Sequence, residues 1–210
     1  IQSAFYWTIS NCWVGSPARA GVRCNDFGRT DTGDWGIYNN QFISGNFDGQ
    51  AYGIEWRSGG GLKIWGNKFD AQSFTVSTMF KYSIYLASTL DPTSDVQIYG
   101  NSIEDYQVSG IMDSIVNRVA HHVINGNHTA GFLSSGPSLD VYGANYVVIG
   151  DNIWAAWTGI SAPAMRFTAD ARATTSSRPL RILIPQSVRC AMRSSSTASM
   201  SPFRLSSSTL

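Results

Sequence analysis

Hydrophobic and polar positions alternate in short motifs that recur along the chain. One motif reads apolar, any, Ile, any, Gly/Asn/Asp, Asn, any, apolar, and LKIWGNKF from Leu62 is a clear copy. Successive copies are 25 to 34 residues apart when their sixth positions are compared. Further copies begin at Trp35, Val96, His122 and Val147, with a weaker one at Trp7. His122 and Thr129 break the two apolar ends of one copy. This periodicity indicates a repeat protein.

A second motif follows each first motif after 10 to 17 residues and consists of a small residue followed by apolar, any, apolar. Copies begin at Gly21, Gly53, Ser83, Ser138 and Ala164, and an imperfect one begins at Gly110. In that copy, Asp113 stands where an apolar residue is expected. Two short alternating strands per repeat predict stacked β-coils. Leucine-rich repeats would require a Leu spacing that is absent, and propeller blades are longer, with four strands each.

Stacked parallel coils predict columns of equivalent side chains, because neighbouring strands lie about 4.8 Å apart. Asn at the sixth position can hydrogen-bond to the next Asn along the stack, and it tolerates the left-handed backbone of a sharp turn. The expected Asn ladder comprises Asn40, Asn67, Asn101, Asn127 and Asn152. The expected internal Ile column comprises Ile37, Ile64, Ile98, Ile124 and Ile149. Asn127 also begins a glycosylation motif, which we interpret as structural because the ladder occupies its amide.

Composition agrees with an all-β chain and divides it into two parts. Seven Trp, nine Tyr, ten Phe and 20 Gly accompany only 14% charged residues, and no apolar run is long enough to span a membrane. Residues 1–170, the predicted β-helix domain, carry 14 acidic and nine basic side chains, a net charge of −5. Residues 171–210 carry six Arg and no acid, which predicts a Ser/Arg-rich cap or a disordered tail with a strand at 180–184. Nucleic-acid binding is not predicted, since this tail lacks interleaved aromatics.

The motifs LKIWGNKF and VQIYGNSI resemble coils of right-handed parallel β-helices of the pectate-lyase-like superfamily, and among these phage tailspike and polysaccharide-depolymerase proteins. The resemblance covers about residues 5 to 168. It implies about six coils, a polysaccharide partner, a location outside the cell or on a virion, and compatibility with a homotrimer. No catalytic motif of the family matches, so the alternatives of polysaccharide lyase, glycoside hydrolase and inert fibre or adhesin module stay open. The prediction requires no cofactor and allows Ca²⁺.

Outward positions are the candidates for function, because inward positions form the core. The residue after the central Ile points outward, which places Tyr38, Trp65 and Tyr99 in one exposed aromatic column. Flat aromatic faces suit the C–H faces of sugar rings. The alternative is that these rings are buried under a long loop or against another chain.

Asp70 and Glu104 are the candidate catalytic residues. They occupy equivalent outward places in adjacent coils, so their backbones are expected about 5 Å apart, and Asp105 follows directly. Two close carboxylates can share a proton and act as acid and base, or as acid and nucleophile. The same pair could bind Ca²⁺ with nearby carbonyls, or be a solvated surface pair.

Other charged residues give weaker predictions. Glu55 and Arg57, two apart on one strand, are expected to form an ion pair or to bind an acidic sugar. His121 and His122 point to opposite sides of a strand, so no zinc site is predicted. The three cysteines, Cys12, Cys24 and Cys190, lack a metal-ligand spacing and are expected to be buried thiols.

Overall fold

The computed structural model describes residues 7–24, 34–45, 51–57, 61–72, 75–88, 95–104, 106–115, 121–131, 136–142, 146–156 and 164–168. The sequence predictions for Asp105, Cys190 and residues 171–210 lie outside these ranges. Within them the secondary structure consists of β-strands and one 3₁₀ turn, η1 (Val76–Thr78).

The described residues form three parallel sheets, each with six strands. Sheet A contains β1 (Trp7–Ser10), β4 (Trp35–Tyr38), β7 (Leu62–Trp65), β10 (Val96–Tyr99), β13 (His121–Asn125) and β16 (Tyr146–Gly150). Sheet B contains β2 (Trp13–Gly15), β5 (Gln41–Ser44), β8 (Lys68–Ala71), β11 (Ser102–Glu104), β14 (His128–Gly131) and β17 (Ile153–Ala156). Sheet C contains β3 (Ala20–Cys24), β6 (Tyr52–Trp56), β9 (Phe80–Ser88), β12 (Tyr106–Ile115), β15 (Leu139–Tyr142) and β18 (Met165–Thr168).

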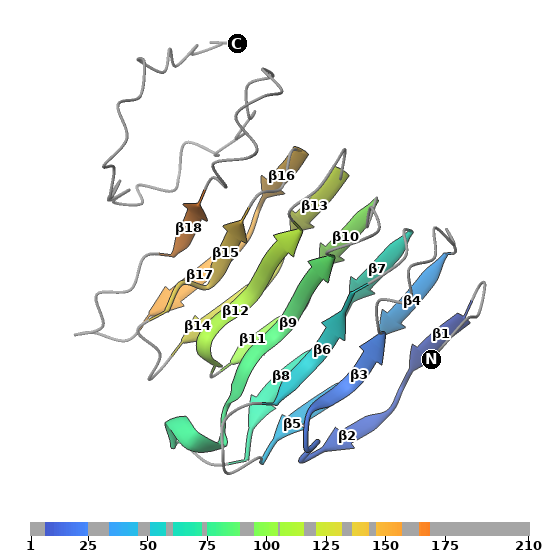
Figure 1. The fold of residues 1–210 in the computed structure, drawn as a ribbon, viewed down its shortest axis with the longest axis vertical. Helices are drawn as coiled ribbons and strands as arrows, with labels where there is room; N and C mark the ends of the chain where they lie inside the picture. The colour runs from blue at the N-terminus through green and yellow to red at the C-terminus, as the bar shows by residue number, and fades with distance from the viewer. Residues whose placement is uncertain are drawn as a thin grey trace.

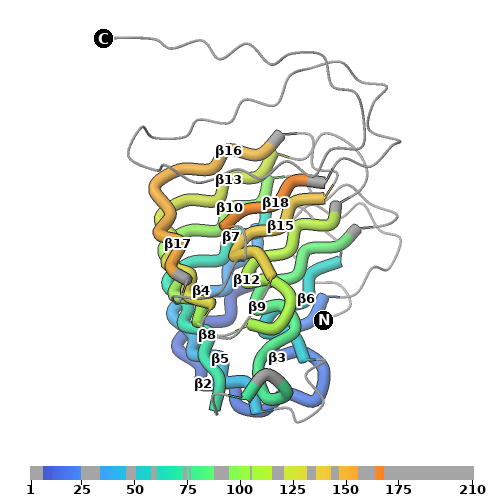
Figure 2. The backbone as a smooth tube through the Cα atoms, turned by 90° about the vertical axis from the view of Figure 1, so that its left-hand side faces the viewer, coloured from blue at the N-terminus to red at the C-terminus, as the bar shows by residue number. Residues whose placement is uncertain are grey.

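The chain passes through sheets A, B and C in turn and then begins the next coil, so each strand from β1 to β15 pairs with the third strand after it. Figures 1 and 2 show the strands stacked in the order of the chain, from blue to orange. The first sequence motif forms a sheet A strand, a turn and the start of a sheet B strand, whereas the second forms a sheet C strand. The predicted fold class, a parallel β-helix, is confirmed by this parallel register.

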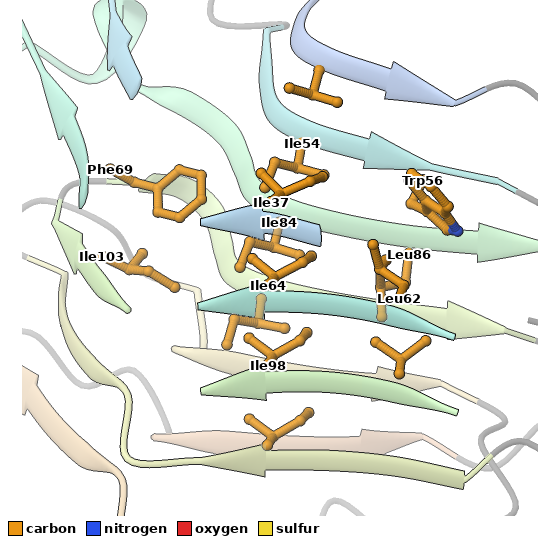
Figure 3. Close-up of a cluster of buried hydrophobic side chains, with 14 of the residues drawn as sticks. Ile37, Ile54, Trp56, Leu62, Ile64, Phe69, Ile84, Leu86, Ile98 and Ile103 are labelled. Atoms are coloured by element: carbon orange, nitrogen blue, oxygen red, sulfur yellow. The ribbon is translucent and has the colours of Figure 1, made fainter. Parts of the chain in front are cut away.

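The interior consists of apolar columns that run along the stack. Ile37, Ile64 and Ile98 are paired in register and completely buried, as the column predicts, and Figure 3 shows them facing side chains of sheet C. In sheet B, the rings of Phe42 and Phe69 stack with centroids 4.9 Å apart. Full burial of each such side chain contributes about 1.5–3 kcal/mol to the hydrophobic stabilisation.

The Asn ladder is also confirmed. Asn40 Nδ2 donates to Asn67 Oδ1 at 3.0 Å, and Asn67 Nδ2 donates to Asn101 Oδ1 at 3.0 Å. The same contact continues from Asn101 to Asn127 at 2.9 Å and from Asn127 to Asn152 at 3.0 Å. Each Oδ1 also accepts the backbone N–H of the preceding ladder residue. Ladder amides therefore satisfy both side-chain and main-chain groups at a buried turn.

The prediction that the ladder Asn adopts a left-handed backbone is wrong by one residue. The positive φ belongs to the residue before it, at 53° for Asn39 and 62° for Gly66. This residue turns the chain, and the following Asn then projects into the interior. Gly66 has a second requirement, because a Cβ at this position would lie 2.5 Å from Asn39 Oδ1. The fifth position of the motif, which holds Gly, Asn or Asp, is therefore the one at which the turn requires a positive φ.

The two described cysteines differ. Cys24 is buried, as expected, but Cys12 is exposed, which corrects that prediction. Cys12 occupies the ladder position of the first described coil, where its backbone N–H donates to Asn40 Oδ1 at 3.0 Å. It is exposed because no described coil continues the ladder beyond it. Among the described residues, no helix has the length and apolar character required to cross a membrane.

Candidate functional site

A column of aromatic side chains lies at the end of three neighbouring strands of sheet A. The ring centroids of Tyr38 and Trp65 are 4.3 Å apart at an interplanar angle of 12°, and those of Trp65 and Tyr99 are 5.7 Å apart at 5°. The rings therefore cover one another's faces and turn their edges to solvent. The outward column is present, but only its two end rings, Tyr38 and Tyr99, keep a face that no ring of the column covers.

A shallow groove runs along the outside of the turn between sheets A and B, beside this column. Its volume is about 400 Å³, within the range of small-ligand sites. We call it the turn groove; it is lined by Asn11, Cys12, Trp13, Asn39, Asn40, Gln41, Gly66 and Lys68. Trp13 lies over Gly15, where a Cβ would be 2.5 Å from the indole, and 68% of its surface is exposed. The groove thus combines an open aromatic surface with side-chain amides.

Sequence reasoning missed Trp13. Its signal is readable in retrospect: in WTISNCWV, Trp13 fills the unrestricted position directly after the Asn place, which faces outward in every coil. Gln41 and Lys68 fill the same position in the next two coils and pair with it in register. An indole at a position with no packing requirement is therefore available to a ligand. This copy departs from the motif at Cys12, directly before Trp13.

Asp70 and Glu104 follow Phe69 and Ile103, which pair across β8 and β11. They occupy equivalent outward positions of adjacent strands, as the register predicts. Lys68 Nζ lies 3.0 Å from Asp70 Oδ2. The hydrogen bond to Asp70, with attraction to Glu104 as a smaller cause, raises the pKa of Lys68. An acid–base pair of carboxylates depends on mutual repulsion, which keeps one of the two groups protonated. The positive charge of Lys68 offsets this repulsion.

The carboxylate of Glu55 points out of β6, yet its side chain is completely buried because three arginines cover it. Arg19 donates from Nε and Nη2 to the two carboxylate oxygens, each at 3.2 Å, and Arg57 Nε donates at 2.6 Å. Arg23 Nε lies 3.0 Å from Oε2, but its N–H does not point at the oxygen, so this contact is an ion pair without a hydrogen bond. We call Glu55 and these three arginines the arginine hub.

The hub carries excess positive charge. Burial alone would raise the pKa of Glu55, but the hydrogen bonds from Arg19 and Arg57 outweigh burial and hold this pKa below its ordinary value. The ionised carboxylate balances one of three guanidiniums and leaves two positive charges. The side chains of Arg19, Arg23 and Arg57 are 56%, 36% and 33% exposed, so part of each remains accessible. The sequence predicted Arg57 as a partner of Glu55. Arg23 could have been predicted as well, because it is in register with Glu55. Arg19 could not, because it lies outside the motif.

Three tyrosines adjoin the hub on the outer face of sheet C. The ring centroids of Tyr52, Tyr82 and Tyr85 are 5.1 to 5.9 Å apart, and their planes lie within 8° to 19° of parallel. The guanidinium of Arg57 lies 5.8 Å from the centre of the Tyr85 ring, and Lys81 Nζ lies 5.9 Å from that of Tyr82. Burial is the main cause that raises the pKa of Tyr52 and of Tyr82, so these phenols stay protonated. We call these three residues the tyrosine cluster.

Two of the residues that break the sequence motifs, Asp113 and His122, contact each other inside the β-helix. Both Asp113 and His122 have completely buried side chains, and His122 Nδ1 shares a short contact with Asp113 Oδ2. Asp113 Oδ1 has no hydrogen-bond partner among the described residues. His121, by contrast, is exposed and lies 3.4 Å from Asp95, so the two histidines point to opposite sides, as predicted. A second outer ion pair joins Arg166 to Asp140, with Nε donating to Oδ1 at 3.1 Å.

Within the described ranges, no group of three or more His, Cys, Asp or Glu side chains is arranged to hold a metal ion. No protein-family model, curated protein or solved structure matches this chain. The fold therefore follows from the strand pairing, and function has to be argued from the outer surface.

Proposed function

We propose that this β-helix binds a polysaccharide, in the manner of the tailspike-like members of the superfamily that its motifs resemble, outside the cell or on a virion. The observation that carries the proposal is Trp13, which offers an exposed indole beside the turn groove. A sugar ring places its C–H face against an indole, while side-chain amides exchange hydrogen bonds with its hydroxyls. Asn39 and Gln41 supply such amides along the groove.

The shape of the surface supports a chain-like ligand. Trp13, Gln41 and Lys68 stand on three successive strands, so ligand contacts repeat about every 4.8 Å along the helix axis. The groove is open along its length and would accept an internal stretch of a polymer without requiring a chain end.

Binding can be tested with a panel of immobilised capsular and plant polysaccharides. For a polysaccharide that the parent retains, Trp13→Ala should weaken binding about tenfold or more, since loss of an anchoring aromatic typically exceeds 1 kcal/mol. Ile153→Ala is the matched control, because Ile153 is an exposed apolar residue on the same sheet at the other end of the stack, with 61% of its surface accessible. Equal weakening by both variants, or retention of no polysaccharide by the parent, would remove the proposal.

A purely structural module is the second candidate, and the aromatic column favours it. Rings that cover one another contribute packing along the helix axis rather than open binding surface. In this alternative, Trp13→Ala and Trp65→Ala leave glycan retention unchanged, and light scattering shows whether either variant shifts the mass of an assembly such as a homotrimer.

Cleavage of the bound polysaccharide is tested separately at Asp70 and Glu104. If the parent releases reducing ends or unsaturated products, Asp70→Asn and Glu104→Gln should each lower the rate at least about 100-fold, because general acid–base catalysis contributes that much. Thermal unfolding would confirm that both variants are folded. Full activity in both would assign the two carboxylates to the surface charge around Lys68.

A further inference from the structure

We propose that the outer face of sheet C is a second binding site, specific for anionic glycans that carry carboxylate or sulfate groups. The site combines the arginine hub with the tyrosine cluster, and its residues lie on the first three strands of this sheet or directly beside their ends. It lies on a different sheet from the turn groove, shares no residue with it, and therefore stands independently of the function proposed above.

The hub provides the charge and the geometry for oxyanions. Guanidinium groups present paired N–H donors that match the two oxygens of a carboxylate or sulfate. Glu55 fixes Arg19 and Arg57 through hydrogen bonds, so less side-chain freedom is lost when a ligand binds. Because one carboxylate cannot balance three guanidiniums, the hub retains a net attraction for an anion. Arg23 adds a third guanidinium, whose Nε is buried against Glu55 while 36% of the side chain stays exposed.

The tyrosine cluster extends this charge into a recognition surface. Tyr52, Tyr82 and Tyr85 are all partly exposed, and their phenol groups can donate hydrogen bonds to ring oxygens, hydroxyls or anionic groups. Lys81 places a further ammonium beside Tyr82. The three guanidiniums and one carboxylate of the hub leave two positive charges, in a domain whose net charge from residue 1 to 170 is −5.

The cations are spread over the face rather than aligned in one column. Arg23, Arg57 and Lys81 belong to or directly follow successive strands, β3, β6 and β9. Because Tyr52 pairs with Tyr82, Lys81 is level with Ala51, whereas Arg57 follows the other end of β6. The hub and Lys81 therefore suit a ligand that carries several anionic groups along an extended chain, as a polyanionic glycan does.

Three other anionic partners fit less well. Single-stranded nucleic acids gain affinity by stacking bases on open aromatic faces, but Tyr82 and Tyr85 face each other, and Lys81 and Arg57 lie over their rings. Duplex DNA can be held by its phosphates alone, which would not require the ring surface of the tyrosine cluster. A membrane surface would require apolar side chains to insert, whereas the described large apolar residues that are exposed lie elsewhere, except for Phe167 at the last strand.

The experiment measures binding of the full chain to a sulfated glycan (heparin oligosaccharides), a carboxylated one (polygalacturonate), a neutral one (dextran) and duplex DNA, each at low and at physiological salt. The expected result is salt-sensitive binding to at least one anionic glycan and none to dextran. Arg19→Gln combined with Arg23→Gln should weaken that binding at least about tenfold, because charge-assisted hydrogen bonds are lost. Lys63→Gln, which removes one charge from sheet A, is the matched control and should change it less than twofold.

Lys81→Gln keeps the test decisive if the double variant does not fold, since Lys81 is not part of the hub; it should weaken the same binding about threefold or more. Trp13→Ala should leave this binding unchanged, which separates the sheet C site from the turn groove. Tighter binding to DNA than to either anionic glycan, equal binding to dextran, or unchanged affinity in the folded arginine variants would each overturn the proposal.

Discussion

Two buried polar regions of this β-helix are built on opposite principles. At the turn between sheets A and B, five asparagines form a ladder in which every amide contacts the equivalent amide of the next coil. At the corner between sheets C and A, by contrast, a single pair of unlike residues, Asp113 and His122, meets inside columns of apolar side chains in the part of the chain that the structure describes. The neighbours above and below them in the two sheets are apolar: Leu86, Val141, Val96 and Val147.

The difference shows how a solenoid can hold polar groups in its interior. Each ladder residue hydrogen-bonds to the equivalent Asn of the next coil, so repeating Asn at one motif position satisfies the polar groups of every coil between the two ends of the ladder. A lone polar residue in an apolar column has no such partner, and it must find a second exception elsewhere. Asp113 ends one coil and His122 begins the next, and each would be strongly destabilising without the other.

The largest expected effect follows from separating Asp113 and His122. Asp113→Leu or His122→Val alone should lower the free energy of unfolding by about 3–5 kcal/mol, because the remaining polar group stays buried without its partner. The double variant Asp113→Leu/His122→Val continues the apolar columns and should be close to the parent in stability, or more stable. Denaturant unfolding of the four proteins completes a double-mutant cycle.

A control for the pair is the exposed neighbour, His121→Ala, which should change stability by less than about 0.5 kcal/mol as a surface substitution. If the two single losses simply add in the double variant, the residues do not act as a pair, and the contrast with the ladder disappears.

The next largest effect concerns one member of the ladder. Asn101→Ala should lower the free energy of unfolding by about 1–3 kcal/mol, because the backbone N–H of Asn67 and the amide of Asn67 both lose the Asn101 oxygen. Asn67→Ala should cost a similar amount by the same reasoning. Thermal and denaturant melts of the two variants would give these values.

Asn125→Ala is the matched ladder control, since Asn125 is an exposed Asn only two residues before the ladder member Asn127. It should be nearly neutral. Melting temperatures that fall equally for Asn101→Ala and Asn125→Ala would mean that the ladder contributes no more than an ordinary surface amide.

The sequence predicted the fold well because, in a repeat protein, each residue pairs with the equivalent residue of the next coil. Ile64 pairs with Ile37 and Ile98, and Asn67 with Asn40 and Asn101, so the spacing of a motif in one dimension defines the neighbours in three. The predicted position of the left-handed residue was wrong by one residue. Both the fifth position of the motif (Gly, Asn or Asp) and the sixth (Asn) carry residues that tolerate a left-handed backbone, so the sequence did not distinguish them.

The candidate site was less predictable because its contacts join positions that do not repeat. Register predicted that Asp70 and Glu104 are neighbours but not that Lys68 lies against Asp70. Outward alternation predicted the aromatic column but not that its rings would stack face to face. Arg19 reaches Glu55 from outside both motifs. These contacts depend on side-chain conformation, which motif spacing does not determine.

The smallest expected effect extends the ladder by one coil. Cys12 occupies the ladder position before Asn40, and its backbone N–H already donates to Asn40 Oδ1 at 3.0 Å, as the ladder asparagines do to their own neighbours. Cys12→Asn would add an amide that donates to the same oxygen, while the weak contact from Cys12 Sγ to Ser10 O at 3.3 Å is lost. One neutral hydrogen bond at a partly exposed site contributes about 0.5–1.5 kcal/mol, so the variant should melt slightly higher than the parent. Cys12→Ser is the control. Its hydroxyl is polar but shorter than an Asn amide and does not reach Asn40 Oδ1, so it should not raise the melting temperature. A Cys12→Asn protein that melts at or below the Cys12→Ser protein would show that the ladder gains nothing from a further residue, and that its stability arises only where coils cover it on both sides.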